Sequence, residues 1–274
     1  MFDKQFDVAI LFQKNTLNGN LRTECFVECL KSLRRHPVRT YHIFINDSTD
    51  IDDLVSWMEG FLPNVEIYYR DFKRMDVRNY RKKGGVFADF HHFAVLRNWV
   101  FETLKAQASP ITTLSIDSDI VLDTFPLELL DFNCPIQFAV DNSNGRKNVW
   151  NCWKVTDERW ESGGRVYKKK NDWFDDKIEE EMEELVNHYF EGDLDLYLYP
   201  LEINICSNVG ACTLFPSSIY TNFSYSFHHQ GEDLSLSDDL IDAGIPVLLY
   251  QKWRTLHLMS PEMLQMYKQT KGVQ

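Results

Sequence analysis

Apolar and polar positions follow two alternating periods along the first half of the chain. Short apolar runs at residues 8–12, 41–45 and 65–69 have the length and the aliphatic and aromatic content of buried strands. Between them, at residues 21–33 and 54–61, apolar residues recur at the spacing of a helix face. Strands that alternate with helices predict an α/β fold, with a Rossmann-like, mostly parallel central sheet flanked by helices.

The most informative stretch combines a third strong helix pattern with a buried strand. Residues 90–106 carry apolar side chains at helical spacing and include Arg97, and residues 111–122 form a β-rich apolar run. That run is interrupted by Asp117, Ser118 and Asp119. Carboxylates at the end of a buried strand are costly unless their charge is compensated, and a divalent cation such as Mn²⁺ or Mg²⁺ does this with oxygen ligands.

The Asp-x-Asp spacing alone is weak support for a metal site. The same pattern occurs at Asp50 and Asp52 and again at Asp193 and Asp195, where no long buried strand precedes it. The strand before Asp117 therefore selects this pair, and two solvated aspartates at a turn are the alternative. In an open parallel sheet, ligands bind at the carboxyl ends of the strands. A nucleotide there would meet Phe12 and Asp47, which end or follow the first two strands.

The second half of the chain is less regular. Residues 126–130 predict a turn of helix and residues 136–140 another strand, whereas residues 141–176 are polar, rich in tryptophan and too long for an ordinary connection. We expect that stretch to be a functional loop or small lobe, with Trp150 and Trp153 as candidates to stack on sugar rings or as core residues. Residues 178–190 predict an acidic helix. A turn and a strand at residues 203–216 contain Gly210, which permits close approach of the backbone.

A further acidic pair precedes the last strand. Glu232 and Asp233 begin a predicted helix, where acidic residues also serve as ordinary partners of the helix dipole. The final predicted strand, residues 247–250, leads to His257. A single histidine is usually structural, so His257 gains weight only from the acidic groups predicted to lie near it.

Charge and composition exclude several classes of protein. The net charge of −12 argues against a general nucleic-acid-binding surface. Basic residues concentrate between residues 70 and 85, which predicts either a mobile loop near an anionic ligand or a solvated connector. The six cysteines lack metal-binding spacing and are expected to be reduced. The sequence shows no signal peptide and no membrane-length apolar run, so we expect a soluble cytoplasmic protein.

These motifs, in this order, resemble the GT-A class of nucleotide-sugar-dependent glycosyltransferases. The matching pieces are the first strand, Arg97-Asn98 in the helix before the Asp117 strand, the segment Ile116-Asp-Ser-Asp-Ile120, the segment Gly231-Glu-Asp233, the helix end Ala243-Gly244-Ile245 and His257. The arrangement is similar to the fungal Anp1-related mannosyltransferases and to the large family-2 inverting group. The resemblance implies a single domain over residues 1–274, with a nucleotide-sugar half (1–125) and an acceptor half (126–274) that contains the irregular insertion at 141–176.

The resemblance also implies roles for individual residues. Asp119, Asp117 and His257 would bind Mn²⁺ or Mg²⁺, and Asp233, beside Glu232, would be the catalytic base of an inverting reaction. The residues expected to bind the nucleotide sugar, a UDP- or GDP-linked donor, are Phe12, Asp47, Arg97, Asp117, Ser118 and Asp119. Trp150, Trp153 and Gly210 would face a glycan or glycoconjugate acceptor. For Arg97, the residues alone leave three possibilities open: a contact with a phosphate, a pair with an aspartate, or a position on the surface.

Two other functions remain open at this point. A nucleotidyltransferase that makes activated sugars is the nearer one, but such enzymes usually carry a glycine-rich basic signature after the first strand, and residues 12–16 contain no glycine. The other is a carbohydrate- or partner-binding protein without activity, which would not need to keep both aspartates, Asp233 and His257. Metal binding separates that protein from an enzyme.

Overall fold

The structure is a computed structural model of the 274-residue chain. It describes residues 4–13, 19–46, 50–72, 87–141, 149–150, 154–155, 159–162, 165–168, 203–206, 209–226, 232–258 and 260–271. Four parallel strands form the N-terminal part of the sheet, in the order β4-β1-β2-β3. Their bounds are Phe6–Phe12 (β1), Val38–Asn46 (β2), Val65–Arg70 (β3) and Thr113–Asp117 (β4). The predicted α/β fold with alternating strands and helices is confirmed.

The remaining strands extend this sheet beyond β4. The full order is β10-β9-β8-β11-β13-β6-β12-β4-β1-β2-β3, while β5 pairs with β13 and β7 with β6. The added strands are β5 (Ile120–Val121), β6 (Ile136–Asp141), β7 (Val149–Trp150), β8 (Lys154–Val155), β9 (Arg159–Ser162), β10 (Arg165–Lys168), β11 (Ile203–Cys206), β12 (Cys212–Phe215) and β13 (Val247–His257). Strand β12 is antiparallel to both β4 and β6, so it separates the parallel block from the parallel pair β6 and β13.

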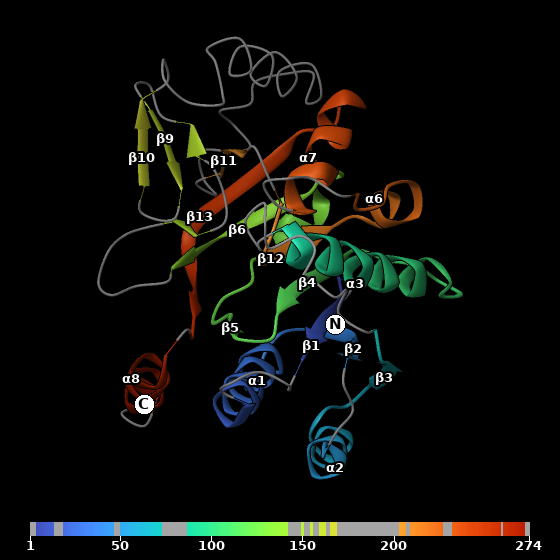
Figure 1. The fold of residues 1–274 in the computed structure, drawn as a ribbon, viewed down its shortest axis with the longest axis vertical. Coiled ribbons are helices and arrows are strands. Elements are labelled where there is room, and N and C mark those ends of the chain that lie inside the picture. The colour runs from blue at the N-terminus through green and yellow to red at the C-terminus, as the bar shows by residue number, and fades with distance from the viewer. Residues whose placement is uncertain are drawn as a thin grey trace.

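Helices cover both faces of the parallel block (Figure 1). Their bounds are α1 (Gly19–Leu33), α2 (Asp52–Phe61), α3 (Phe87–Lys105), η3 (Leu127–Asp131), α6 (Ser217–Asn222), α7 (Glu232–Asp242) and α8 (Pro261–Lys271). Helices α1 and α2 pack with the β1 residues Val8 and Ile10, whereas α3, α6 and α7 pack on the opposite face with Ala9. The alternation of side chains along a strand explains why neighbouring β1 residues belong to different cores.

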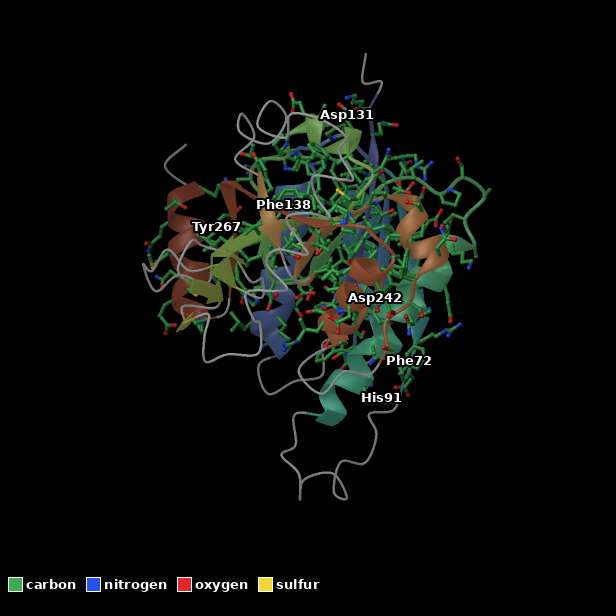
Figure 2. The ribbon with its side chains drawn as sticks, turned by 90° about the horizontal axis from the view of Figure 1, so that it is seen from above. Phe72, His91, Asp131, Phe138, Asp242 and Tyr267 are labelled. Atoms are coloured by element: carbon green, nitrogen blue, oxygen red, sulfur yellow. The ribbon has the colours of Figure 1, made fainter. Side chains whose placement is uncertain are left out.

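The interior is filled by large aromatic and aliphatic side chains. Phe138 of β6 is fully buried and packs against Phe125 and Tyr250, with ring centroids 5.9 Å and 5.5 Å away. Figure 2 places Phe138 in the interior, while Asp131, at the end of η3, lies at the rim beside exposed Lys4. None of the described helices is long and apolar enough to cross a membrane.

Several sequence predictions need correction or lie outside the described residues. The stretch at 141–176 was predicted to be irregular, but it contains the short strands β7 to β10, which extend the sheet by pairing with one another and with β6 and β11. Helices α6 and α8 were not predicted. The run at 247–250 is only the first part of β13, which continues to His257. The predicted acidic helix at 178–190 and most of the basic segment at 70–85 lie outside the described residues.

Candidate functional site

The Asp117–Asp119 turn joins two strands at the carboxyl edge of the parallel block. Asp117 is the last residue of β4, and Ile120 begins β5, which pairs antiparallel with the end of β13. That pairing sets His257 opposite Ile120, and the N–H of Leu258 donates to the carbonyl of Asp119 at 2.8 Å. The pairing of β5 with β13 therefore places His257 next to Asp119.

His257 and Asp119 are in direct contact. The Nε2 atom of His257 lies 3.1 Å from Oδ1 of Asp119, and the two side chains are 11% and 28% exposed. Burial lowers the pKa of His257, but the bond to Asp119 and the charge of Asp117 outweigh it, so the pKa is raised above its ordinary value. An imidazole nitrogen and a carboxylate oxygen in contact favour a positively charged histidine or, in its place, a bound cation.

The donor types present here fit Mn²⁺ or Mg²⁺. Oxygen ligands and a neutral imidazole suit Mn²⁺, and hard cations commonly keep waters and substrate phosphates beside one or two protein carboxylates. Within the part of the chain that the structure describes, no three His, Cys, Asp or Glu side chains gather closely enough to hold a metal ion. Asp119 and His257 are therefore two described side chains in contact whose donor atoms could hold such an ion. The third predicted ligand, Asp117, is directed towards a different partner.

That partner is Arg97, from the middle of α3. Its Nη2 atom lies 3.6 Å from Oδ1 of Asp117, and its Nε atom lies 3.0 Å from Oε1 of Glu232 and 3.4 Å from Oδ1 of Asp233. Of the possibilities left open by the sequence, pairing with carboxylates is the one seen here, and the side chain is only 14% exposed. Burial lowers the pKa of Arg97, yet the three carboxylates raise it well above its ordinary value, so the guanidinium stays charged.

Asp233 and Glu232 occupy the first turn of α7 and are nearly inaccessible to solvent. Burial raises the pKa of Asp233, Arg97 lowers it, and the neighbouring charges of Glu232 and Asp117 raise it again, with a net increase. Burial likewise raises the pKa of Asp117, partly offset by Arg97. A carboxylate whose pKa is raised in this way is suited to accept a proton near neutral pH.

Side-chain hydrogen bonds fix the start of α7. Ser237 donates to the carbonyl of Asp233 at 2.9 Å and accepts from the N–H of Val209 at 3.0 Å. Ser235 accepts from the N–H of Ser226 at 2.9 Å. The carboxylates of Glu232 and Asp233 are therefore carried on a rigid helix end.

Side chains on α1 and just after it contact the backbone on both sides of the aspartate turn. Ser32 accepts from the N–H of Leu122 at 3.0 Å, and a ring nitrogen of His36 lies 3.0 Å from the Leu122 carbonyl. One and two turns earlier on α1, Cys29 points its thiol at the carbonyl of Asp117 (3.9 Å) and Cys25 at that of Leu258 (3.4 Å). Both thiols are free and buried, and burial raises the pKa of each, so they remain protonated.

The other predicted site residues lie in the interior, in the aspartate turn, in β7 or outside the described residues. Phe12 is fully buried and stacks on Phe26 with centroids 4.5 Å apart, so its side chain belongs to the core. Gly210 is buried too, and its N–H donates to Oε1 of Gln137 at 2.7 Å, inside the protein. Ser118 lies between the two aspartates, partly exposed. Trp150 is in β7, paired with Val140, while Asp47 and Trp153 lie outside the described residues.

Sequence reasoning missed Tyr225 as a site residue. The guanidinium carbon of Arg97 lies 5.8 Å from the centroid of its buried ring. Its backbone exchanges two hydrogen bonds with the side chain of Asn98, each 2.7 Å long. Asn98 was noted beside Arg97, but no local pattern around Tyr225 distinguishes it from the other aromatic residues between 220 and 227.

Comparisons with known proteins find similarity in structure but not in sequence. No protein-family model matches the chain, and no curated protein sequence is detectably similar to it. Among solved structures, GalNAc-T7 with UDP, GalNAc and Mn²⁺ superposes with a TM-score of 0.54 at 9% identity, over 93% of this chain and 44% of that one. A fragment of S. aureus TarS in complex with UDP gives a TM-score of 0.50 at 12% identity, over 96% and 62%.

This chain therefore spans less than two thirds of each of those two structures. The inositol-1-phosphate CTP transferase from T. maritima also matches, at 13% identity over 97% of this chain and 95% of that chain, with a TM-score of 0.48. Identities this low are informative about the fold alone. The chain has the mixed α/β architecture of the GT-A-like proteins, as its sequence motifs predicted.

Proposed function

We propose that this protein is a divalent-metal-dependent glycosyltransferase. It would transfer a sugar from a UDP- or GDP-linked donor to a hydroxyl group of a glycan or glycoconjugate, with inversion. The observation that carries the proposal is that two groups of acidic side chains lie close together at the carboxyl end of β4. One is the Asp119–His257 pair, and the other is the pair Glu232 and Asp233, which shares Arg97 with Asp117.

The two groups match the two charge changes of glycosyl transfer. When the sugar–phosphate bond breaks, negative charge develops on the departing nucleoside diphosphate, and a metal ion held by Asp119 and His257 would stabilise it. On the acceptor side, a hydroxyl group loses its proton as the new bond forms. Asp233, a buried carboxylate with a raised pKa, is suited to take that proton.

The ligands of two structures with a similar fold indicate which donor and metal to assay first. The GalNAc-T7 structure contains UDP and Mn²⁺, and the TarS fragment contains UDP. Both superpose over more than nine tenths of this chain. A UDP-linked donor with Mn²⁺ is therefore the first combination to assay, with GDP-linked donors second.

The activity assay separates this function from the nucleotidyltransferase alternative. The purified protein is incubated with Mn²⁺ and UDP- or GDP-linked sugars in the presence of an array of glycan acceptors, and separately with UTP, CTP or GTP and sugar 1-phosphates. A glycosyltransferase releases nucleoside diphosphate and labels an acceptor in the first reaction. Release of pyrophosphate in the second reaction alone would contradict the proposal in favour of a nucleotidyltransferase.

A further inference from the structure

We infer that Arg97 is a positioning residue for the base Asp233 and is not a ligand of the donor phosphates. This inference rests on the proposed function and refines it. A basic residue near a diphosphate site is ordinarily expected to bind phosphate, and the sequence alone allows that role. The geometry around Arg97 indicates the other role.

Two of the three guanidinium nitrogens of Arg97, Nε and Nη2, face carboxylates from two separate elements. Its Nε atom lies between Glu232 and Asp233, at 3.0 and 3.4 Å, and its Nη2 atom faces Asp117 at 3.6 Å. Asp117 is the last residue of β4 and begins the Asp117–Asp119 turn, whereas Glu232 and Asp233 begin α7. The guanidinium of Arg97 thus links the carboxyl end of β4 to the first turn of α7.

The surroundings of Arg97 restrict its movement. Its side chain is only 14% exposed, and the ring of Tyr225 lies over the guanidinium at 5.8 Å. The next residue, Asn98, binds both the N–H and the carbonyl of Tyr225, which anchors that ring to α3. If Arg97 left to follow a departing diphosphate, the buried carboxylates of Glu232 and Asp233 would lose their cation, which is strongly unfavourable.

The contact also explains how Asp233 is kept ready for a proton. In the described part of the chain its Oδ1 atom is buried and makes no hydrogen bond, although Nε of Arg97 lies 3.4 Å away. Glu232 accepts the hydrogen bond from Nε of Arg97, at 3.0 Å, so Asp233 lies beside the charge of the guanidinium without accepting that hydrogen bond. Arg97 therefore fixes the orientation of Asp233 through the shared helix end and leaves one oxygen without a donor.

A mutant cycle on Arg97 and Asp233 tests the inference. Arg97→Gln, Arg97→Lys, Asp233→Asn and the double variant Arg97→Gln/Asp233→Asn are compared with wild type. Two quantities are measured: the Kd of UDP or GDP with Mn²⁺, by calorimetry, and kcat and KM for nucleoside diphosphate release from the matching nucleotide sugar. Arg39→Gln is the matched control, because Arg39 forms a bidentate pair with buried Asp7 at the opposite end of the strands, 2.9 and 2.6 Å long.

We expect Arg97→Gln to lower kcat by about 10²-fold or more while the Kd of the nucleotide changes by less than about threefold. In the Asp233→Asn background, the same change should have little further effect, because residues that act as a unit are not additive. Arg97→Lys should retain the charge but not the three-way contact, so its kcat should lie between those of wild type and Arg97→Gln. Arg39→Gln should leave kcat unchanged.

Two results would overturn the inference. If Arg97→Gln weakens nucleotide binding as much as it lowers kcat/KM, and its effect multiplies with that of Asp233→Asn, then Arg97 is a phosphate ligand and the proposed function stands. If wild type binds no nucleoside diphosphate in the presence of Mn²⁺, the proposed function fails and this inference fails with it.

Discussion

The imidazole of His257, at the end of β13, lies 3.1 Å from the carboxylate of Asp119, in the turn that follows β4. Each residue comes from a different half of the chain, and the pairing of β5 with β13 sets their separation. Without a contact to a side chain from another part of the chain, the Asp-x-Asp segment would be an ordinary turn at the end of a strand. The contact turns a local sequence motif into a candidate site.

The first prediction concerns His257. Replacing it with alanine should weaken Mn²⁺ binding by at least about tenfold, because even residues that only orient a metal ligand contribute that much. Mn²⁺ affinity can be measured directly from the electron paramagnetic resonance signal of free Mn²⁺ during titration. His42→Ala is the control, since His42 contacts Asp7, which belongs to neither acidic group. Equal Mn²⁺ affinity in wild type and His257→Ala would remove His257 from the metal site.

The second prediction concerns the base. Asp233→Asn keeps the size of the side chain but removes its ability to accept a proton, so transfer should slow by about 10²- to 10⁴-fold. Binding of nucleotide and Mn²⁺ should be retained, because Asp233 contacts Arg97 and is not part of the Asp119–His257 pair. A kinetic assay with saturating donor gives the rate and calorimetry gives the Kd. Turnover close to that of wild type would exclude Asp233 as the base.

The third prediction follows from the raised pKa of Asp233. Burial is the main cause, and the nearby charges of Glu232 and Asp117 add to it against the opposing effect of Arg97. A base works only when deprotonated, so the rate should increase with pH through a midpoint above the ordinary aspartate value of about 3.9. Initial rates at constant Mg²⁺ between about pH 5 and pH 8 measure this increase. A flat profile over that range, or the same increase in Asp233→Asn, would contradict the assignment.

The two acidic segments of the candidate site could be predicted because each follows a recognisable local pattern of apolar residues. A buried strand before Asp117 and a helix start at Glu232 are visible in the spacing of apolar residues. The contacts of these segments with other parts of the chain were not predictable, since Arg97 and Glu232 meet only through the packing of α3 on α7. The resemblance to GT-A proteins supplied the expectation that these pieces belong together.

In the fold, too, the local elements of the N-terminal part were predictable and the pairing of distant segments was not. The alternating strands and helices up to β4 follow from periodicity, with boundaries that shift by a few residues. The antiparallel direction of β12 was not predicted, because a single apolar run does not reveal its partners. Helix α8 was missed because its buried residues, Met263, Leu264 and Tyr267, are few and its remaining positions are polar.

The fourth prediction tests a charge cluster remote from the candidate site. Burial raises the pKa of Asp7, but hydrogen bonds from His42 and Arg39 outweigh it, so the pKa is lowered below its ordinary value. The stability from this cluster is therefore present above the unfolded-state pKa of about 3.9 and is lost as the pH falls through the lower folded-state value.

Unfolding in urea, measured as a function of pH, checks this expectation. Asp7→Asn should be less stable than wild type at neutral pH, and the difference should shrink as the pH falls below about 4. Asp131→Asn is the control, because Asp131 pairs with Lys4 on the exposed surface, where an ion pair contributes little. A difference between Asp7→Asn and wild type that stays constant down to acid pH would contradict the role of the charge.

The central claim is that Asp119 and His257 bind a metal ion that holds a nucleotide-sugar donor. The most direct test is thermal unfolding of wild type and Asp119→Ala with UDP, GDP, CDP and their common sugar conjugates, each with and without Mn²⁺. A ligand that binds only the folded state raises its stability by about 2.7 kcal/mol at 100 times its Kd. We predict that one nucleotide stabilises wild type only when Mn²⁺ is present and does not stabilise Asp119→Ala. Stabilisation of both proteins, or of neither by any nucleotide, would contradict the account.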